Sequence, residues 1–315
     1  MESQSMTNQK PSTPQGLLGL IRRHPLFWYF LLAFAWTWSW YILGFSVFHL
    51  SPKVTELVTI PAPFGPAISA FLLVGLTEGK TGVLRLLRRL VLWRVSFRWY
   101  LLMLVCLPLL ILLCFLAVPG AMASFHAPAP TFALRYLGGY IVILLLGGPL
   151  GEEPGWRGFA LPRLQQRWGP LRGSLVLGIL WGLWHLSVFF LVPGYNGADG
   201  TFFGIISAFV PFVIGVSALA ILYTWVFNNT CGSLLLAILL HASFDTAGSM
   251  FALFFPSSLS QSLLANVIEE SFFVGVALLL IIATRGHLSY KRFLREASPD
   301  KGNESHDGPA LRELS

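Results

Sequence analysis

Two adjacent carboxylates stand inside an apolar stretch of the chain. Glu153 precedes Arg157 by four residues, so the two can share one face of a helix as an ion pair. That pairing leaves Glu152 free for a separate task. An ionisable side chain at membrane depth is costly and is a functional candidate by default. The competing interpretation is an ordinary helix end whose charges lie in water.

Two histidines lie in other apolar runs. His185 follows Trp181 by four residues, and His241 precedes Asp245 by four, so each pair shares a helical face. An Asp beside a His can orient the imidazole and favour its charged form. The structural alternative is a histidine, or a His–Asp pair, that joins neighbouring helices by hydrogen bonds.

Carboxylates and imidazoles from separate helices suit the activation of water for hydrolysis. A buried carboxylate can take a proton from water, and a histidine can hold that water or stabilise the oxyanion that follows. The same residue types are typical zinc ligands, so Glu152, His185 and His241 are also a candidate metal site. Both mechanisms stay open: direct activation with no cofactor, or a single zinc-like divalent metal.

Helices must bring these side chains together. Hydrophobic residues make up 55% of the 315 residues and charged residues 11%, against about a quarter charged in ordinary globular domains. This composition predicts an all-α, polytopic membrane helix bundle of about eight transmembrane helices. Eight apolar runs approach the ~20 residues that a spanning helix needs: 26–48, 56–76, 99–118, 132–153, 173–192, 203–227, 233–255 and 263–284.

The basic residues predict the orientation. The net charge is +7, and the Lys and Arg residues lie in short connections, which fits anionic lipid and the positive-inside rule better than a nucleic-acid partner. With both termini cytoplasmic, every Lys and Arg except Lys53 and Arg135 falls on the cytoplasmic side. The short loops and the lack of organelle signals favour a bacterial cell (inner) membrane.

The chain divides into five expected segments. Residues 1–16 are expected to be a disordered tail, and 17–131 the N-terminal transmembrane helices. A catalytic transmembrane core follows at 132–255, then the last transmembrane helix at 256–290, and a basic and polar disordered tail at 291–315. Within the core, either Pro154 bends the fourth helix or this helix runs on through Phe159 and Leu161. Glu269 and Glu270, near the start of the last run, are expected to cap it at the interface.

Three motifs together resemble a known family. They are Glu152-Glu153-x-x-x-Arg157-Gly158, an aromatic residue (Trp181) four before His185, and His241-x-x-x-Asp245. The chain is similar here to the CPBP (CAAX protease and bacteriocin-processing, or Abi) intramembrane proteases, which are type II CAAX prenyl endopeptidase-like. The resemblance covers roughly residues 135–255.

The resemblance implies a hydrolase that cuts peptide bonds of membrane-associated peptides or proteins, with its site open to the cytoplasm. Glu152 would be the general base, His185 would hold the water, and His241 with Asp245 would stabilise the oxyanion. Glu153, Arg157 and Trp181 would support them. The family is often called a metalloprotease, and a metal-independent glutamate mechanism is also argued for it.

The sequence departs from the family at two positions. Trp181 stands where Phe is common, which keeps an aromatic ring. Asp245 stands where Asn is common, and an ionised Asp cannot donate a hydrogen bond to an oxyanion. Asp245 must then be protonated, orient His241 or bind metal. An inactive family member and a non-enzymatic transporter or scaffold remain the alternatives.

Overall fold

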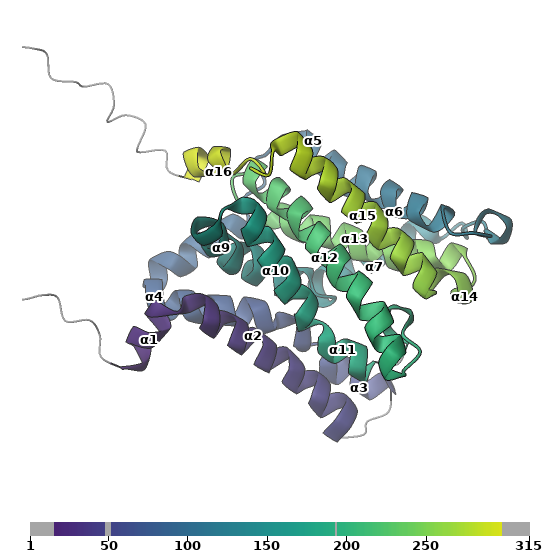
Figure 1. Ribbon diagram of the computed structural model, residues 1–315, viewed down its shortest axis with the longest axis horizontal. Helices are drawn as coiled ribbons and strands as arrows, with labels where there is room; N and C mark the ends of the chain where they lie inside the picture. Colours follow the sequence, from purple (N-terminus) through teal and green to yellow (C-terminus); the bar gives the residue numbers. More distant parts are fainter. Residues whose placement is uncertain (1–15, 48–51, 193, 298–315) are drawn as a thin grey trace, which may run out of the picture.

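Long apolar helices run side by side through the protein (Figure 1). The computed structural model describes residues 16–47, 52–192 and 194–297. In these segments seven helices are long and apolar enough to cross a membrane, and one bent pair brings the number to eight. This confirms the predicted all-α bundle of about eight transmembrane helices.

The helices follow one another through short connections. Their bounds are α1 Leu17–Arg23, α2 Pro25–Ile42, α3 Pro52–Thr59, α4 Gly65–Leu90, α5 Phe97–Leu101, α6 Leu107–Leu116, α7 Phe132–Leu146, α8 Pro149–Gly155, α9 Leu161–Trp168, α10 Pro170–Trp184, α11 Leu186–Leu191, α12 Phe202–Asn229, α13 Leu234–Phe251, α14 Ser257–Ser260, α15 Leu263–Thr284 and α16 Tyr290–Ala297. Short π-helical segments extend α2 (Leu43–Val47), join α5 to α6 (Leu102–Cys106) and join α8 to α9 (Trp156–Ala160).

The fourth span differs from its predicted extent. The predicted run ends at 153, whereas the helical path continues through α8 and α9 to Trp168, with a 44° bend between α7 and α8. The bend lies at Gly147 and Gly148, and the φ of 125° at Gly148 suits glycine alone. Pro154 lies inside α8 without ending it, and the π-helical segment follows directly. Of the two expected alternatives, the helix that runs on is therefore the one observed.

Glycines let α8 approach the start of α4 closely. A Cβ atom on Gly151 would lie 2.6 Å from the carbonyl oxygen of Pro63, and one on Gly155 would lie 2.5 Å from that of Pro66. No side chain fits at either distance, so both positions require glycine. This contact fixes the short helix that carries Glu152 against the rest of the bundle.

One end of the bundle, here called the basic end, gathers most of the basic connections. Asn228 donates hydrogen bonds of 2.8 Å to Gln165 and to the carbonyl of Leu288, and Ser233 donates to the carbonyl of Leu92 at 2.7 Å. These bonds join α9, the end of α12, and the connections that follow α4, α12 and α15. In Figure 1, α1, α9 and α16 lie at this end.

The other end, here called the far end, holds the remaining connections. The backbone of His126 donates to the carbonyl of Phe254 at 2.8 Å, which ties the α6–α7 connection to the end of α13. Gly197 lies against Gln261 and Leu263, so the α11–α12 connection touches the start of α15. The segment predicted as a tail at 291–315 begins with α16, which reaches Ala297. Residues 298–315, and all but Gly16 of the tail predicted at 1–16, lie outside the described residues.

Candidate active site

The predicted site residues converge on one cavity. A cavity of about 490 Å³ is lined by Glu152 of α8, His185 at the end of α10, and His241 with Asp245 of α13. Trp181 also lines it. Four-residue spacing in α10 and α13 turns each pair toward the same space. The supporting residues Glu153 and Arg157 do not line the cavity and lie fully buried behind it.

Two indole groups hold the Glu152 carboxylate. Trp181 Nε1 donates to Glu152 Oε2 at 2.8 Å, and Trp156 Nε1 donates to the same oxygen at 3.1 Å. Oε1 accepts no hydrogen bond from any residue that the structure describes. A Cβ atom on Gly148 would lie 2.6 Å from Oε1, so glycine at the bend leaves room beside this oxygen. Trp181 therefore does more than the aromatic ring expected from the sequence, because phenylalanine has no N–H to donate.

A buried ionic cluster lies behind the cavity. Arg157 Nη1 donates to Glu153 Oε1 at 2.9 Å, and His241 Nδ1 lies 2.8 Å from the same oxygen. The pairing expected from the spacing of Glu153 and Arg157 is thus present, and it extends to a histidine on another helix. The Arg157 guanidinium lies 4.2 Å from the ring centroid of Trp181 and 4.0 Å from that of Tyr223, close enough for cation–π attraction.

His185 lies at the junction between α10 and α11. Its Nδ1 is 2.9 Å from the carbonyl oxygen of Trp181. Because only a protonated nitrogen can donate to a carbonyl, Nδ1 carries the proton and Nε2 of the neutral ring keeps its lone pair. The rings of Trp184 and Phe212 pack edge-to-face against the imidazole, with centroids at 4.7 and 5.1 Å. The ring is thus fixed with Nε2 available to a ligand in the cavity.

Asp245 faces the second nitrogen of His241. The distance from His241 Nε2 to Asp245 Oδ2 is 3.5 Å, too long for a strong hydrogen bond. The Asp245 side chain is 30% exposed, whereas that of His241 is 7% exposed. His241 therefore has one nitrogen fixed to Glu153 and the other directed between Asp245 and the cavity.

The donor geometry does not fit the candidate metal site. Among the described residues, no group of three or more His, Cys, Asp or Glu side chains is arranged to hold a metal ion. Both nitrogens of His241 face carboxylate oxygens of the protein, and both indole N–H groups point at one oxygen of Glu152. A zinc ligand must offer a free lone pair, which His241 does not in this arrangement.

One acidic pair lies elsewhere than the sequence predicts. Glu269 and Glu270, expected to cap the last helix at the interface, line the cavity together with Asn266. Their carboxylates lie within the apolar run 263–284, so the rule that singled out Glu152 applies equally to them. Absence of a neighbouring His or Arg in the sequence hid this, because the other residues that line the cavity come mostly from other helices.

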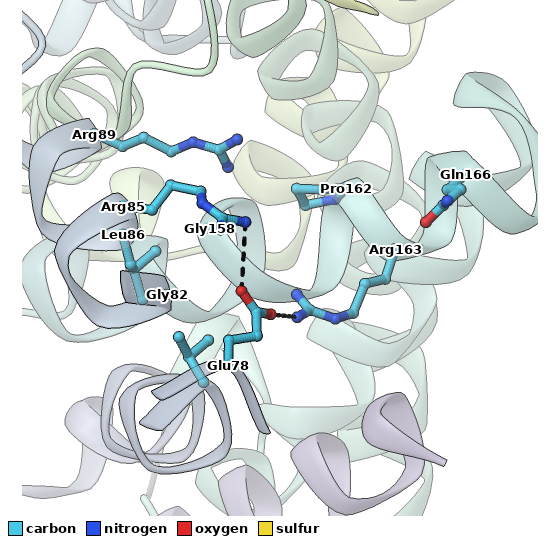
Figure 2. A pocket seen from close by; sticks show the side chains of 10 residues that line it. Glu78, Gly82, Arg85, Leu86, Arg89, Gly158, Pro162, Arg163 and Gln166 are labelled. Carbon is cyan, nitrogen blue, oxygen red and sulfur yellow. Dashed lines mark hydrogen bonds and ion pairs between the residues drawn. The ribbon is translucent and has the colours of Figure 1, made fainter. Parts of the chain in front are cut away.

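The cavity extends toward the far end of the bundle. Its lining includes Tyr41, at the end of α2, and Tyr195 with Asn196 in the α11–α12 connection. A second cavity shares Tyr195, Asn196 and Ser249 with it and continues to Gln261, beside α14. The cavity at the basic end shares no lining residue with either (Figure 2). The lining of the site cavity therefore extends toward the far end of the bundle and shares no residue with the cavity at the basic end.

Comparison with known proteins supports the resemblance seen in the motifs. The family model for type II CAAX prenyl endopeptidase Rce1-like proteins matches residues 134–247, which include every predicted site residue. The CAAX prenyl protease 2 of Methanococcus maripaludis is 26% identical over 268 residues, covering 81% of this chain and 90% of that relative. These matches confirm the predicted intramembrane endopeptidase function at the level of the family. Residues 134–247 are thus similar in sequence to the type II CAAX prenyl endopeptidase Rce1-like family.

Proposed function

We propose that this intramembrane endopeptidase uses Glu152 as the general base that activates water. The observation that carries the proposal is the orientation of the carboxylate: two indole N–H groups hold Oε2, and Oε1 is left to a ligand in the cavity. A water beside Oε1 can lose its proton to the carboxylate as it attacks the carbonyl carbon of a peptide bond. Proton transfer of this kind contributes about 10²–10⁴ in rate.

His185 is the second holder of that water. Its Nδ1 is committed to the Trp181 carbonyl, so Nε2 can accept a hydrogen bond from water in the cavity. One O–H group of the water donates to Glu152 and the other to His185, and together these two hydrogen bonds fix the direction of the oxygen lone pair that attacks the substrate. This positioning lowers the entropic cost of the attack.

His241 is the proposed donor to the oxyanion. Glu153 holds Nδ1 in place. Because Asp245 lies 3.5 Å from Nε2, the Nε2–H group is only weakly engaged and can donate a hydrogen bond to the negative charge that develops on the substrate oxygen. Asp245 then aligns the ring rather than donating itself. This role differs from that of Asn, the residue common in the family, which can donate directly.

A glutamate mechanism fits these contacts better than a metal-dependent one. His241 has no free lone pair in the observed geometry, and a metal at Glu152 and His185 alone would have two protein ligands. Catalytic zinc sites usually have three. We therefore expect a strong chelator to leave cleavage unchanged in the purified protein, whereas loss of activity restored by zinc would support the metalloprotease.

We place the basic end at the cytoplasmic face of a bacterial inner membrane, with both termini on that side. The cavity would then open to the extracytoplasmic side, contrary to the cytoplasmic opening implied by the resemblance. The substrate class that follows is a peptide or protein segment that reaches the membrane from outside the cytoplasm. The name of the Methanococcus maripaludis relative points to prenylated CAAX proteins, but the access side proposed here does not favour them.

Cysteine labelling tests the access side. Cys231 lies at the basic end, and Ser258→Cys would place an exposed thiol at the far end. Burial and the neighbouring Glu296 raise the pKa of the Cys231 thiol to about 11, so long reaction times at mildly alkaline pH are needed. In intact cells, a membrane-impermeant maleimide should label Ser258→Cys, and Cys231 only after permeabilisation. The reverse pattern would restore the cytoplasmic opening.

The activity itself is tested in nanodiscs, which have no second compartment and therefore cannot support transport. The purified protein should cut members of a library of membrane-bound peptides, and mass spectrometry should find new termini at defined bonds. Absence of cleavage, combined with ion-coupled solute uptake in proteoliposomes, would instead favour a transporter.

A further inference from the structure

A second cavity, at the basic end, has no part in the proposed catalysis. It measures about 250 Å³ and lies between α4 and the segment Gly158–Gln166 that follows the site helix. Figure 2 shows Arg85 and Arg89 reaching into it from α4 and Arg163 from the facing side. The cavity, here called the arginine cavity, therefore concentrates three guanidinium groups in a small volume.

A turn in α4 brings the arginines to this position. Gly79 has φ 65° and ψ −160°, outside the helical region, and the helix changes direction there. Only glycine adopts this conformation without strain. The part of α4 after Gly79 carries Arg85 and Arg89 four residues apart, on one helical face. Like charges at this spacing repel each other, so the arrangement costs stability unless an anion lies nearby.

The protein supplies too little negative charge for the arginine cavity. Glu78 is the one carboxylate in its lining; Arg163 donates to Glu78 Oε1 at 2.6 Å, and Arg85 lies 3.5 Å from Oε2. Arg89 has no carboxylate partner among the described residues, and its guanidinium carbon lies 5.9 Å from the ring centroid of Phe227. Three positive charges against one leave an excess of two.

The surroundings favour a lipid as the source of the missing anion. Leu84 and Leu87 lie within the same two turns of α4 as Arg85 and Arg89, and each is 42% exposed. Exposed leucines beside arginines at the end of a membrane bundle are typical of the headgroup region, where basic pockets between helices bind anionic headgroups. Arginine forms paired, charge-assisted hydrogen bonds with phosphate oxygens.

We propose that the arginine cavity binds the phosphate-containing headgroup of an anionic phospholipid, with Arg89 as its principal ligand. Arg85 and Arg163 flank the same headgroup while keeping their bonds to Glu78. A bound headgroup would join α4 to the segment that continues directly from Glu152 and Arg157. The inference does not depend on the proposed catalysis, because it rests on a separate cavity.

The test measures stabilisation of the purified full-length protein in mixed micelles. Phosphatidylglycerol is titrated, and the unfolding midpoint gives the concentration for half of the maximal shift. Arg89→Gln should raise this concentration about tenfold. Arg88→Gln is the matched control, because Arg88 is the neighbouring basic residue, is exposed and lies outside the cavity lining; it should change the value less than twofold. Equal effects of the two substitutions would overturn the proposal.

Two further titrations identify the source of the anion. Phosphatidylcholine, which has no net charge, should stabilise the wild-type protein only weakly; an effect equal to that of phosphatidylglycerol would overturn the proposal. Inorganic phosphate should give no shift at micromolar concentration, and an Arg89-dependent shift there would overturn the lipid in favour of free phosphate. If Arg89→Gln does not fold, Arg89→Lys is compared with Arg88→Lys instead. Only Arg89→Lys should weaken lipid binding, because lysine cannot form the paired hydrogen bonds that a guanidinium group makes with a phosphate.

Discussion

Glu152 and Glu153 are neighbours with the same chemistry, and the structure predicts opposite consequences of replacing each by glutamine. Glu153 is fully buried and serves two partners: Arg157 at 2.9 Å and His241 at 2.8 Å. Glu153→Gln keeps the shape but removes the only carboxylate bonded to the guanidinium of Arg157 among the described residues. Removing one partner of a buried ion pair costs about 3–5 kcal/mol. We therefore expect a large loss of stability.

Glu152→Gln should behave differently. The amide oxygen of glutamine can still accept the two indole N–H groups of Trp156 and Trp181, so two hydrogen bonds remain but lose their assistance from charge. The buried negative charge is also lost, together with its desolvation cost. These changes oppose each other, and we expect a net change within about 1 kcal/mol. Activity should nevertheless fall by about 10²–10⁴, because an amide cannot act as a base.

Reversible unfolding in mixed micelles, followed by circular dichroism, gives the free energy of unfolding, and peptide cleavage gives the activity. A double variant, Glu153→Gln with Arg157→Met, should recover most of the stability lost in Glu153→Gln, because it no longer buries an unpaired charge. If Glu153→Gln unfolds like the wild type, or if Glu152→Gln loses as much stability as Glu153→Gln, the division between a catalytic and a structural carboxylate is wrong.

Three other substitutions test single contacts. Trp181→Phe removes one of the two hydrogen-bond donors to Glu152 while keeping a ring beside Arg157. We expect kcat to fall about tenfold, which corresponds to an activation free energy higher by about 1.4 kcal/mol. An unchanged kcat would show that this hydrogen bond does not orient the base. Asp245→Asn should keep cleavage within about tenfold of wild type, since Asn can still accept from His241; a much larger loss would make the carboxylate itself essential. Gly155→Ala would place a Cβ atom 2.4 Å from the Tyr29 hydroxyl and should lower the free energy of unfolding by about 1–3 kcal/mol. In the control Gly275→Ala, the new Cβ atom meets nothing within 4 Å, so the protein should be as stable as the wild type or slightly more stable. Thermal unfolding of both variants measures the difference.

The features of the site that depend on the geometry of a single helix could be predicted from the sequence. Four-residue spacing correctly paired Glu153 with Arg157 and put His241 and Asp245 on one face, because the helical period determines both. Ionisable residues in apolar runs pointed to Glu152 and to the two histidines, and all three line the same cavity. Their convergence on one cavity is a result of helix packing, which the spacing within each helix does not determine.

Contacts between helices account for what the sequence analysis missed. That Trp156 and Trp181 share one oxygen of Glu152 depends on side-chain orientations on two different helices. Glu269 was assigned to the interface because no His or Arg lies near it in sequence, yet it lines the cavity. The bend expected as one alternative at Pro154 lies instead at Gly147 and Gly148, where the positive φ needs glycine, and a π-helical segment follows Pro154 without ending the helix.

The direction of the cavity required the full packing. Charge placement predicts which connections share a side, but it does not show to which end a pocket opens. The shared lining at Tyr195 and Ser249 links the site to the far end, and this connection joins residues of α11–α12 and α13 that no sequence pattern relates.

The central claim is that a water activated by Glu152 attacks the peptide bond, and cleavage in ¹⁸O-labelled water measures this directly. Purified wild-type protein and Glu152→Gln are incubated with the same peptide, with Glu296→Gln, a surface carboxylate variant, as the matched control. We expect one ¹⁸O atom in the new carboxyl terminus for the wild type and for Glu296→Gln, and a rate lower by at least about a hundredfold for Glu152→Gln. Labelled product formed by Glu152→Gln at the wild-type rate would contradict it.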